Sequence, residues 1–197
     1  MTNTSPLTAY QEAFYHHFPL DPCRHYIENY LEQIRVLLEQ CLQKHPRYII
    51  VGFRLAPWFQ SPGELSEEIL PLFCHQLRPA ISVEGAPLIY YAWSREQRQG
   101  ERDEYRVFLL IPRDRHLDSM AFGYLLSNLH RHITTAWGLT FSVPGEFASR
   151  SFDKLVDHEG QITFGTELMT PTRSWVFRWM SDLLAASATK PLDGAMN

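Results

Sequence analysis

Two segments in the middle of the chain decide the fold: Leu88-Ile-Tyr-Tyr-Ala-Trp-Ser-Arg-Glu-Gln97 and Glu104-Tyr-Arg-Val-Phe-Leu-Leu-Ile111. Both are rich in aromatic and β-branched or long apolar side chains, which is typical of strands. The polar stretch between them contains Gly100 and five charged or amide side chains, which indicates a hairpin tip. The sequence therefore predicts two adjacent strands, over 88–96 and 104–111, at the centre of the chain.

Longer elements flank this hairpin on both sides. Apolar side chains recur at three- and four-residue intervals in the helical segments, and Pro46 and Gly138 are expected to end two of them. Four elements follow from these signals: a helix over 23–44, a strand over 48–55, a helix that starts at a capping box at 61–64 and runs to about 77, and a helix over 117–137.

The two ends of the chain give weaker signals. Residues 1–22 predict an irregular arm with one short helix around 10–17. After the long helix we expect a strand over 139–143, a loop over 144–160, a brief edge strand over 161–164 and a last helix over 171–188. Residues 191–197 predict a flexible tail.

The order of these elements predicts an α+β fold of the split βαβ, ferredoxin-like type. Two βαβ-like passages surround a central hairpin, which gives a mainly antiparallel sheet of four to five strands with helices packed on one face. The expected organisation is an N-terminal arm over 1–22, a single domain over 23–190 and the tail.

Composition narrows the class of protein. The chain has 197 residues, 45% of them hydrophobic, and a formal net charge of -4, so the whole-molecule field does not favour non-specific adhesion to phosphates. No apolar run approaches the roughly 20 residues needed to cross a bilayer, and the N-terminus has no signal-peptide pattern. The three widely spaced cysteines predict buried free thiols and a cytoplasmic location.

Several segments together resemble one known family. They are Tyr91-Ala-Trp-Ser-Arg-Glu-Gln97 with the polar loop and strand that follow, Arg54 in the earlier strand, Ala136-Trp-Gly-Leu139, and Thr189-Lys190. In this order and spacing they are similar to the YagK/YfjJ C-terminal domain family, which includes replication-initiation proteins of filamentous phages and their prophage relatives. The likeness covers roughly residues 25–190 and implies the fold of HUH-type replication initiators (HUH Rep-like).

The resemblance also implies a chemistry that this chain lacks. An HUH nickase holds a divalent metal ion with two histidines one residue apart on a strand, and a tyrosine of a later helix attacks the phosphate. Here Glu104 and Arg106 stand at the histidine positions, and a guanidinium cannot ligate a metal. The family's Tyr-Leu-Ala-Lys segment matches positions close to 183–186, and no tyrosine follows Tyr124. The resemblance therefore implies a non-catalytic relative.

The candidate site residues follow from this interpretation. No catalytic residue and no cofactor are expected. Glu104 and Arg106 face the same side of their strand and can form an ion pair across the former metal pocket, or Arg106 can hold a phosphate in place of the metal. The candidate nucleic-acid-binding residues are Arg54, Trp58, Arg95, Arg106, Arg150 and Lys154.

Other polar and aromatic residues have a structural interpretation beside the functional one. His130 and His132 fall in a helical segment, where residues two apart cannot share one metal ion. Tyr124 is either a displaced nucleophile or an aromatic residue packed on the sheet, and Arg95 either binds phosphate or forms a salt bridge. Trp175 and Trp179 are four residues apart, and core packing explains such a pair, whereas Trp58 is the expected exposed tryptophan.

Three functions remain open at this point. The first is an inactive relative of a prophage or plasmid replication initiator that binds single-stranded or hairpin DNA, or a protein partner, in a regulatory role. The second is a metal-dependent single-strand nickase with a rearranged site, for which Glu96 and Glu104 are the candidate ligands. The third is a protein-interaction module without nucleic-acid binding, which the acidic net charge favours.

Overall fold

The computed structural model describes most of the chain. The described residues are 9–10, 14–20, 26–56, 69–81, 89–96, 104–112, 119–142, 152–154, 164–168 and 172–182.

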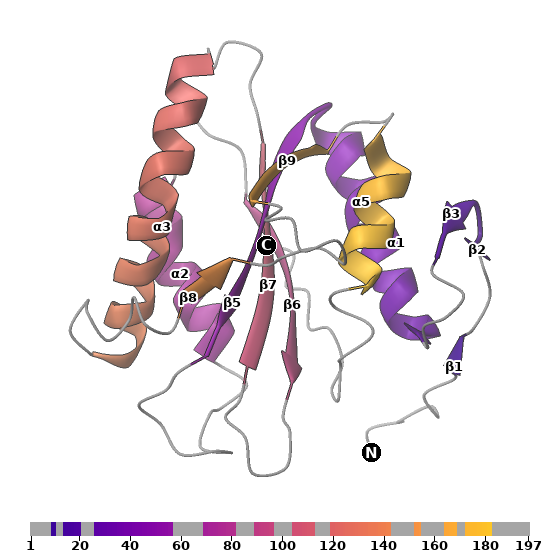
Figure 1. Cartoon of the computed structure of the whole chain (residues 1–197), viewed down its shortest axis with the longest axis horizontal. Coiled ribbons are helices and arrows are strands. Elements are labelled where there is room, and N and C mark those ends of the chain that lie inside the picture. Colours follow the sequence, from indigo (N-terminus) through magenta and orange to yellow (C-terminus); the bar gives the residue numbers. More distant parts are fainter. Residues whose placement is uncertain are drawn as a thin grey trace.

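A five-stranded antiparallel sheet forms the centre of the protein (Figure 1). The predicted hairpin forms one side of this sheet, where β6 (Tyr90–Glu96) pairs with β7 (Glu104–Pro112). On its other side β7 pairs with β5 (Tyr48–Leu55), whose bounds match the predicted strand. The far edge of β5 is shared by β8 (Phe152–Lys154) and β9 (Phe164–Leu168). A mixed α+β fold with a mainly antiparallel sheet is thus confirmed.

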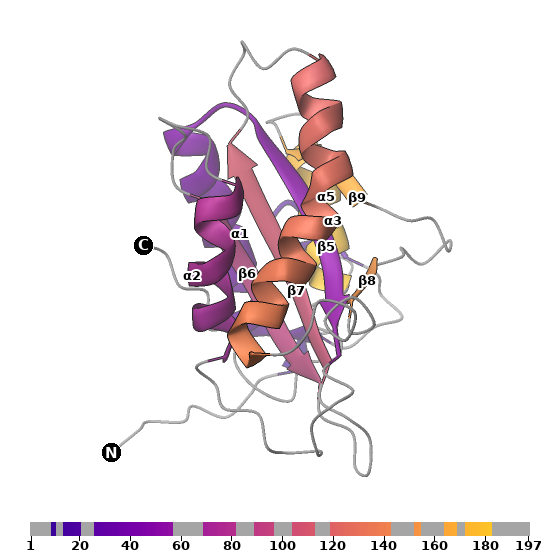
Figure 2. The same ribbon diagram turned by 90° about the vertical axis from the view of Figure 1, so that its left-hand side faces the viewer.

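Helices cover both faces of this sheet, so the expectation that they pack on one face was wrong. Helices α2 (Ile69–Ile81) and α3 (Ser119–Phe141) lie on one side, and α1 (Glu28–Lys44) and α5 (Arg173–Met180) lie on the other (Figure 1). Seen from a direction 90° away, α2 and α3 lie in front of the strands (Figure 2). The physical reason is that β5 is apolar at successive positions, and such a strand needs cover on both faces.

The core is correspondingly divided in two by the sheet. Ile50 and Phe108 pack with α1 and α5, while their neighbours Ile49 and Leu109 pack with α2 and α3. All four side chains are at most 1% exposed. Each helix pair therefore buries its own face of the sheet.

Helix α3 extends further than the sequence predicted. It continues through Gly138 to Phe141, so the predicted stop at that glycine and the predicted strand over 139–143 were wrong. The aromatic side chains explain the extension, because Trp137 and Phe141 lie one turn apart with ring centroids separated by 4.7 Å. Their packing outweighs the roughly 1 kcal/mol that glycine costs inside a helix. The helix ends at Ser142, which has a positive φ of 54°.

The N-terminal segment forms short strands, and the predicted helix around 10–17 was wrong. Strand β1 (Ala9–Tyr10) pairs with β4 (Tyr26–Ile27), which directly precedes α1. Strands β2 (Phe14–Tyr15) and β3 (Phe18–Pro19) form a tight hairpin with His16 at a φ of 52°. Because the ring of Phe18 stacks on that of Phe177 in α5 at 4.3 Å, the hairpin belongs to the core.

The remaining boundaries differ from the predictions in detail. Helix α1 begins at Glu28 rather than 23, because β4 occupies the two preceding residues. Helix α2 runs to Ile81 with Pro79 inside its last turn, and the capping box at 61–64 lies outside the described residues. The predicted edge strand over 161–164 shares only Phe164 with β9, because 161–163 lie outside the described residues, and β8 was not predicted. Residues 183–197, including the predicted tail, also lie outside the described residues.

None of the helices in the described part of the chain has the length and apolar character that crossing a membrane requires.

Candidate functional site

Charged residues replace the apolar rows at one end of the sheet, on the face that carries α1 and α5. On this face Tyr90, Ala92 and Phe108 belong to the core cluster. Further along the strands, Ser94 of β6 lies opposite Arg106 of β7, and Arg106 lies opposite Arg54 of β5. Cross-strand partners project from the same face of a sheet, so the three strands present one polar row.

Glu104 joins the two arginines of this row. Arg106 donates from Nε to Glu104 Oε1 at 3.3 Å, and Arg54 donates from Nη1 to Glu104 Oε2 at 3.4 Å. The side chains of Glu104 and Arg106 are 22% and 18% exposed, and that of Arg54 is 42% exposed. We call these three residues the Glu104 cluster. It confirms the predicted ion pair of Glu104 with Arg106 and adds Arg54 to it.

Two acidic residues and a serine hydroxyl border the Glu104 cluster. By backbone register Glu96 lies opposite Glu104, and Asp153 of β8 lies opposite Arg54. The hydroxyl of Ser94 is buried beside Arg106 and has no hydrogen-bond partner. A buried hydroxyl without a partner is uncommon in folded proteins. Ser94 is therefore a donor that a ligand at Arg106 would satisfy.

The Glu104 cluster has the chemistry of a phosphate site rather than of a metal centre. Two guanidinium groups share the Glu104 carboxylate, and neither of them can ligate a metal. A cation bound to Glu104 would lie within a few Å of both, where like unit charges repel by about 4 kcal/mol near a protein surface. No group of three or more His, Cys, Asp or Glu residues within the described ranges is arranged to hold a metal ion.

The structure does not bring the other sequence candidates to this row. Arg95 lies opposite Tyr105 in the register, on the face of α2 and α3, and is only 6% exposed. Lys154 is the register partner of Phe53 at the other side of β5. Trp58 and Arg150 lie outside the described residues. Of the six candidates, Arg54 and Arg106 are the two that the structure places together.

The histidine pair lies where the periodicity predicted it, on α3. His130 is exposed and His132 is half-buried, and both lie within one turn of a continuous helix. Since residues two apart on a helix point to different sides, the pair cannot form one metal site. The backbone of Tyr124 also lies in α3.

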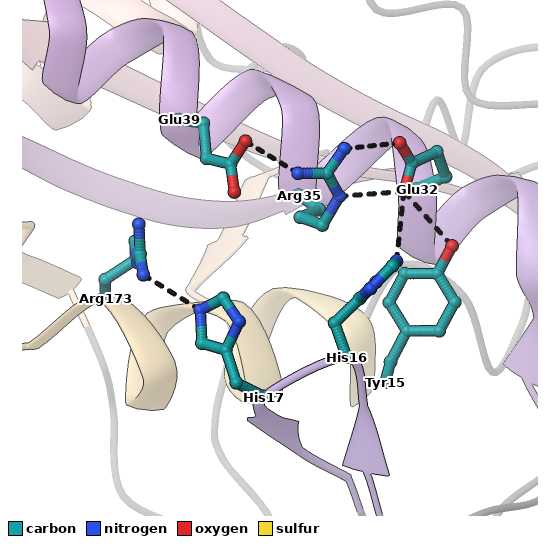
Figure 3. Close-up of polar contacts among 7 residues, drawn as sticks. All are labelled: Tyr15, His16, His17, Glu32, Arg35, Glu39 and Arg173. Atoms are coloured by element: carbon teal, nitrogen blue, oxygen red, sulfur yellow. Dashed lines mark hydrogen bonds and ion pairs between the residues drawn. The ribbon is translucent and has the colours of Figure 1, made fainter.

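A second polar network fastens the N-terminal hairpin to α1 (Figure 3). The hydroxyl of Tyr15 donates to Glu32 Oε2 at 3.1 Å, and Arg35 donates to both oxygens of Glu32 at 2.8 and 2.5 Å. Arg35 also reaches Glu39 Oε2 at 2.6 Å, and His16 Nε2 lies 4.0 Å from Glu32. The network therefore links the tip of the hairpin to three successive turns of the helix.

These contacts shift the pKa values of two groups in the network, Glu32 and Tyr15. The hydrogen bonds from Arg35 hold the pKa of the Glu32 carboxyl below its usual value, against the opposing effect of burial. Burial, followed by the hydrogen bond to Glu32, raises the pKa of Tyr15 to about 12. Both groups therefore keep the charge state that the hydrogen bond between them requires across the neutral range.

On the other side of the hairpin, His17 contacts α5. Arg173 Nη2 lies 2.8 Å from His17 Nε2 (Figure 3). The guanidinium carbon of Arg173 also lies 5.1 Å from the ring centre of Phe18. A guanidinium has only donors, so the ring nitrogen of His17 is the acceptor in this contact.

An apolar pocket of about 150 Å³ lies between α2 and the sheet. Leu77, Ile81 and Leu109 line it, and the thiol of Cys74 borders it. Burial raises the pKa of Cys74 to about 12, so this thiol is protonated and a poor nucleophile at neutral pH. The pocket, whose lining also includes His75 and Tyr91, lies on the face of the sheet opposite the Glu104 cluster and has no part in that cluster.

Sequence reasoning missed one exposed aromatic residue. Trp175 was interpreted as a core residue together with Trp179, but its side chain is 46% exposed whereas Trp179 is 5% exposed. One feature of the sequence indicated that Trp175 is exposed: arginines stand near it on the same helix, at positions 173 and 178.

Comparison of the chain with protein-family models, with curated proteins and with solved structures finds no match.

Proposed function

We propose that this protein is a non-catalytic relative of a prophage or plasmid replication initiator that binds single-stranded or hairpin DNA as a regulatory factor. One observation carries the proposal. At the two strand positions where the resemblance implies metal-ligating histidines, Glu104 and Arg106 form an ion pair that Arg54 of the neighbouring strand extends. The guanidinium groups of Arg106 and Arg54, bridged by the carboxylate of Glu104, thus stand where a nickase would hold its cation.

The topology supports the ferredoxin-like, HUH Rep-like part of the proposal. Strand β7 lies between β5 and β6, which α2 connects, and the sheet order is β6-β7-β5-β8. This strand order supports a split βαβ fold, with α2 and α3 as the two helices on one face. Helices α1 and α5 on the second face are additions to that plan.

The chemistry of the Glu104 cluster supports phosphate binding. Arginine presents a planar fork of donors that fits phosphate oxygens, and Arg54 is the most exposed member of the cluster. The unpartnered hydroxyl of Ser94 beside Arg106 is a further donor. Because the net charge of the chain is -4, binding must come from this local site and should be sensitive to salt.

The binding test compares matched arginine variants. We expect wild-type protein to raise the fluorescence anisotropy of a labelled 15-nucleotide single strand, and Arg54→Ala to weaken that binding by about tenfold. The slope of log affinity against log salt should fall by about one for each lost phosphate contact. Arg47→Ala, at an exposed arginine just before β5, is the control and should bind like wild type.

The catalytic test separates this proposal from the nickase with a rearranged site. We expect no covalent protein–DNA adduct on a denaturing gel after incubation with single-stranded DNA and Mg²⁺ or Mn²⁺. An adduct, or a calorimetric Mn²⁺-binding signal that Glu104→Ala abolishes, would establish the alternative. Wild-type protein that fails to bind any single strand at low salt would favour the protein-interaction module instead.

A further inference from the structure

One tryptophan differs from the others that the structure describes. Trp93, Trp137 and Trp179 are at most 5% exposed, whereas Trp175 on α5 is 46% exposed. A large aromatic side chain half in solvent is an apolar surface that the monomer itself leaves uncovered.

Stacking on the rest of α5 holds the indole of Trp175 in place. Its ring lies 5.5 Å from that of Trp179 at an interplanar angle of 26°. Trp179 in turn packs edge-on against Phe108 of β7 at 4.7 Å and 87°. The three rings form a continuous aromatic column from the sheet to the surface, in which one side of Trp175 stacks on Trp179 while 46% of the side chain is open to solvent.

Two arginines flank Trp175 in the sequence of α5. Arg178 is one turn from Trp175 on the same helix, and its side chain is 39% exposed. Its Nε is buried and lies 3.9 Å from Asp182 Oδ2, which is an ion pair but too long for a hydrogen bond, so the exposed remainder of the guanidinium is the part that a phosphate can reach. Arg173, two residues before Trp175, is held by His17 and by the ring of Phe18.

The aromatic column also ends beside the Glu104 cluster. Phe108 lies two residues after Arg106 on the same strand and projects from the same face, a separation of roughly 7 Å along β7. A single strand bound at Arg106 is therefore within a few nucleotides of Trp179 and Trp175.

We propose that Trp175 is a stacking platform for an unpaired base of single-stranded nucleic acid, with Arg178 contacting the adjoining phosphate. A flat aromatic ring beside a guanidinium matches the alternation of bases and phosphates in such a strand. A protein surface is the alternative occupant, because tryptophan and arginine are also enriched at protein interfaces, and the self-association measurement below distinguishes the two. This inference rests on the proposed function and names how the strand is held.

The test uses protein variants at position 175 and at a matched exposed residue. Trp175→Ala should weaken binding of a 15-nucleotide oligo-dT at least about fivefold, and Trp175→Phe, which keeps an aromatic ring, should bind closer to wild type. Trp175→Leu keeps apolar bulk without a π-face and should behave like Trp175→Ala. Leu139→Ala, at another exposed apolar residue, is the control and should change nothing.

Two further readouts separate stacking from charge. Oligo-dT should quench a component of the tryptophan fluorescence in wild type that is missing in Trp175→Leu. The salt slope should stay unchanged in the Trp175 variants and fall by about one in Arg178→Ala. Circular dichroism melting checks that each variant is folded.

The outcomes distinguish this inference from the proposed function. If Arg54→Ala weakens binding while Trp175→Ala and Trp175→Leu do not, the stacking platform is wrong and the DNA-binding function stands. If wild type binds no single strand at low salt, both are wrong. If wild type self-associates in sedimentation and Trp175→Leu does not, Trp175 lies at an interface between copies, and the stacking platform is again wrong.

Discussion

At the scale of single residues, Glu32 decides how the N-terminal hairpin is held. Its carboxylate accepts hydrogen bonds from Tyr15 and Arg35 and lies 4.0 Å from His16. All of these contacts require Glu32 to be ionised. The hydrogen bonds from Arg35 lower its pKa in the folded state, so the attachment of the hairpin depends on pH.

We expect Glu32→Gln to lower the melting temperature by about 2–4 °C at pH 7 and to lower it progressively less as the pH falls below the unfolded-state pKa. The folded-state pKa of Glu32 lies below that of the unfolded chain, roughly 4.3. Its stabilisation is therefore present above that value and is lost as the pH falls through the folded-state pKa. Thermal melts of both proteins from pH 3 to 7 measure this. A difference that did not shrink at all as the pH is lowered would mean that charge is not the cause.

The residue scale also shows what the sequence could and could not predict of the candidate site. Strand alternation correctly placed Glu104 and Arg106 on one face, because the period of two is local to β7. Arg95 was grouped with them although it lies on the opposite face, opposite Tyr105. The pairing register decides whether a side chain of β6 lies on the same face of the sheet as a given side chain of β7. A shift of the register by one residue would move every side chain of β6 to the opposite face.

At the scale of elements, Trp137 joins two helices to the sheet. Its ring centroid lies 5.4 Å from that of Phe73 in α2, 6.2 Å from that of Tyr105 in β7 and 4.7 Å from that of Phe141. The side chain is fully buried. Much of the attachment of α3 therefore depends on this one indole.

Trp137→Ala should reduce the free energy of unfolding by about 3–5 kcal/mol, because it removes an aromatic side chain from a packed junction. Leu139→Ala, two residues along the same helix and 59% exposed, should change it by no more than about 0.5 kcal/mol. Urea denaturation of the two variants and the wild type gives both values. Equal effects of the two substitutions would show that α3 does not pack as described.

Element boundaries were predictable where breakers and local patterns agree. The predicted strand over 48–55 matches β5, since a dense apolar run stands there between Pro46 and Pro57. The C-terminal end of α3 was not predictable from the sequence. The contacts of Trp137 with β7 outweigh the tendency of the following glycine to end a helix. The three residues of β8 carry too short a pattern to identify from sequence.

At the scale of the whole molecule, the N-terminal segment packs against the last described helix, α5. Phe18 and Leu20 of the N-terminal segment belong to the same core cluster as Val176 and Phe177 of α5. The hydroxyl of Tyr26 also hydrogen-bonds to Asp182. These contacts join segments that are far apart in the sequence, so no local pattern could predict them, and the arm was expected to be irregular.

Deletion of residues 2–20 should therefore destabilise the whole domain rather than trim a dispensable arm. Tyr15, Phe18 and Leu20 are each at most 6% exposed, and burying such side chains contributes roughly 1.5–3 kcal/mol apiece. A loss of about 5 kcal/mol is comparable to the whole stability of many domains and lowers a melting temperature by roughly 10–20 °C. Differential scanning calorimetry measures the shift, and binding of an apolar dye reports the exposed face of Phe177. Deletion of residues 2–8, which stops before β1, is the matched control and should melt close to wild type. If both truncated proteins melt within about 2 °C of the full chain, the hairpin contributes no core packing, and its contacts with α1 and α5 are superficial.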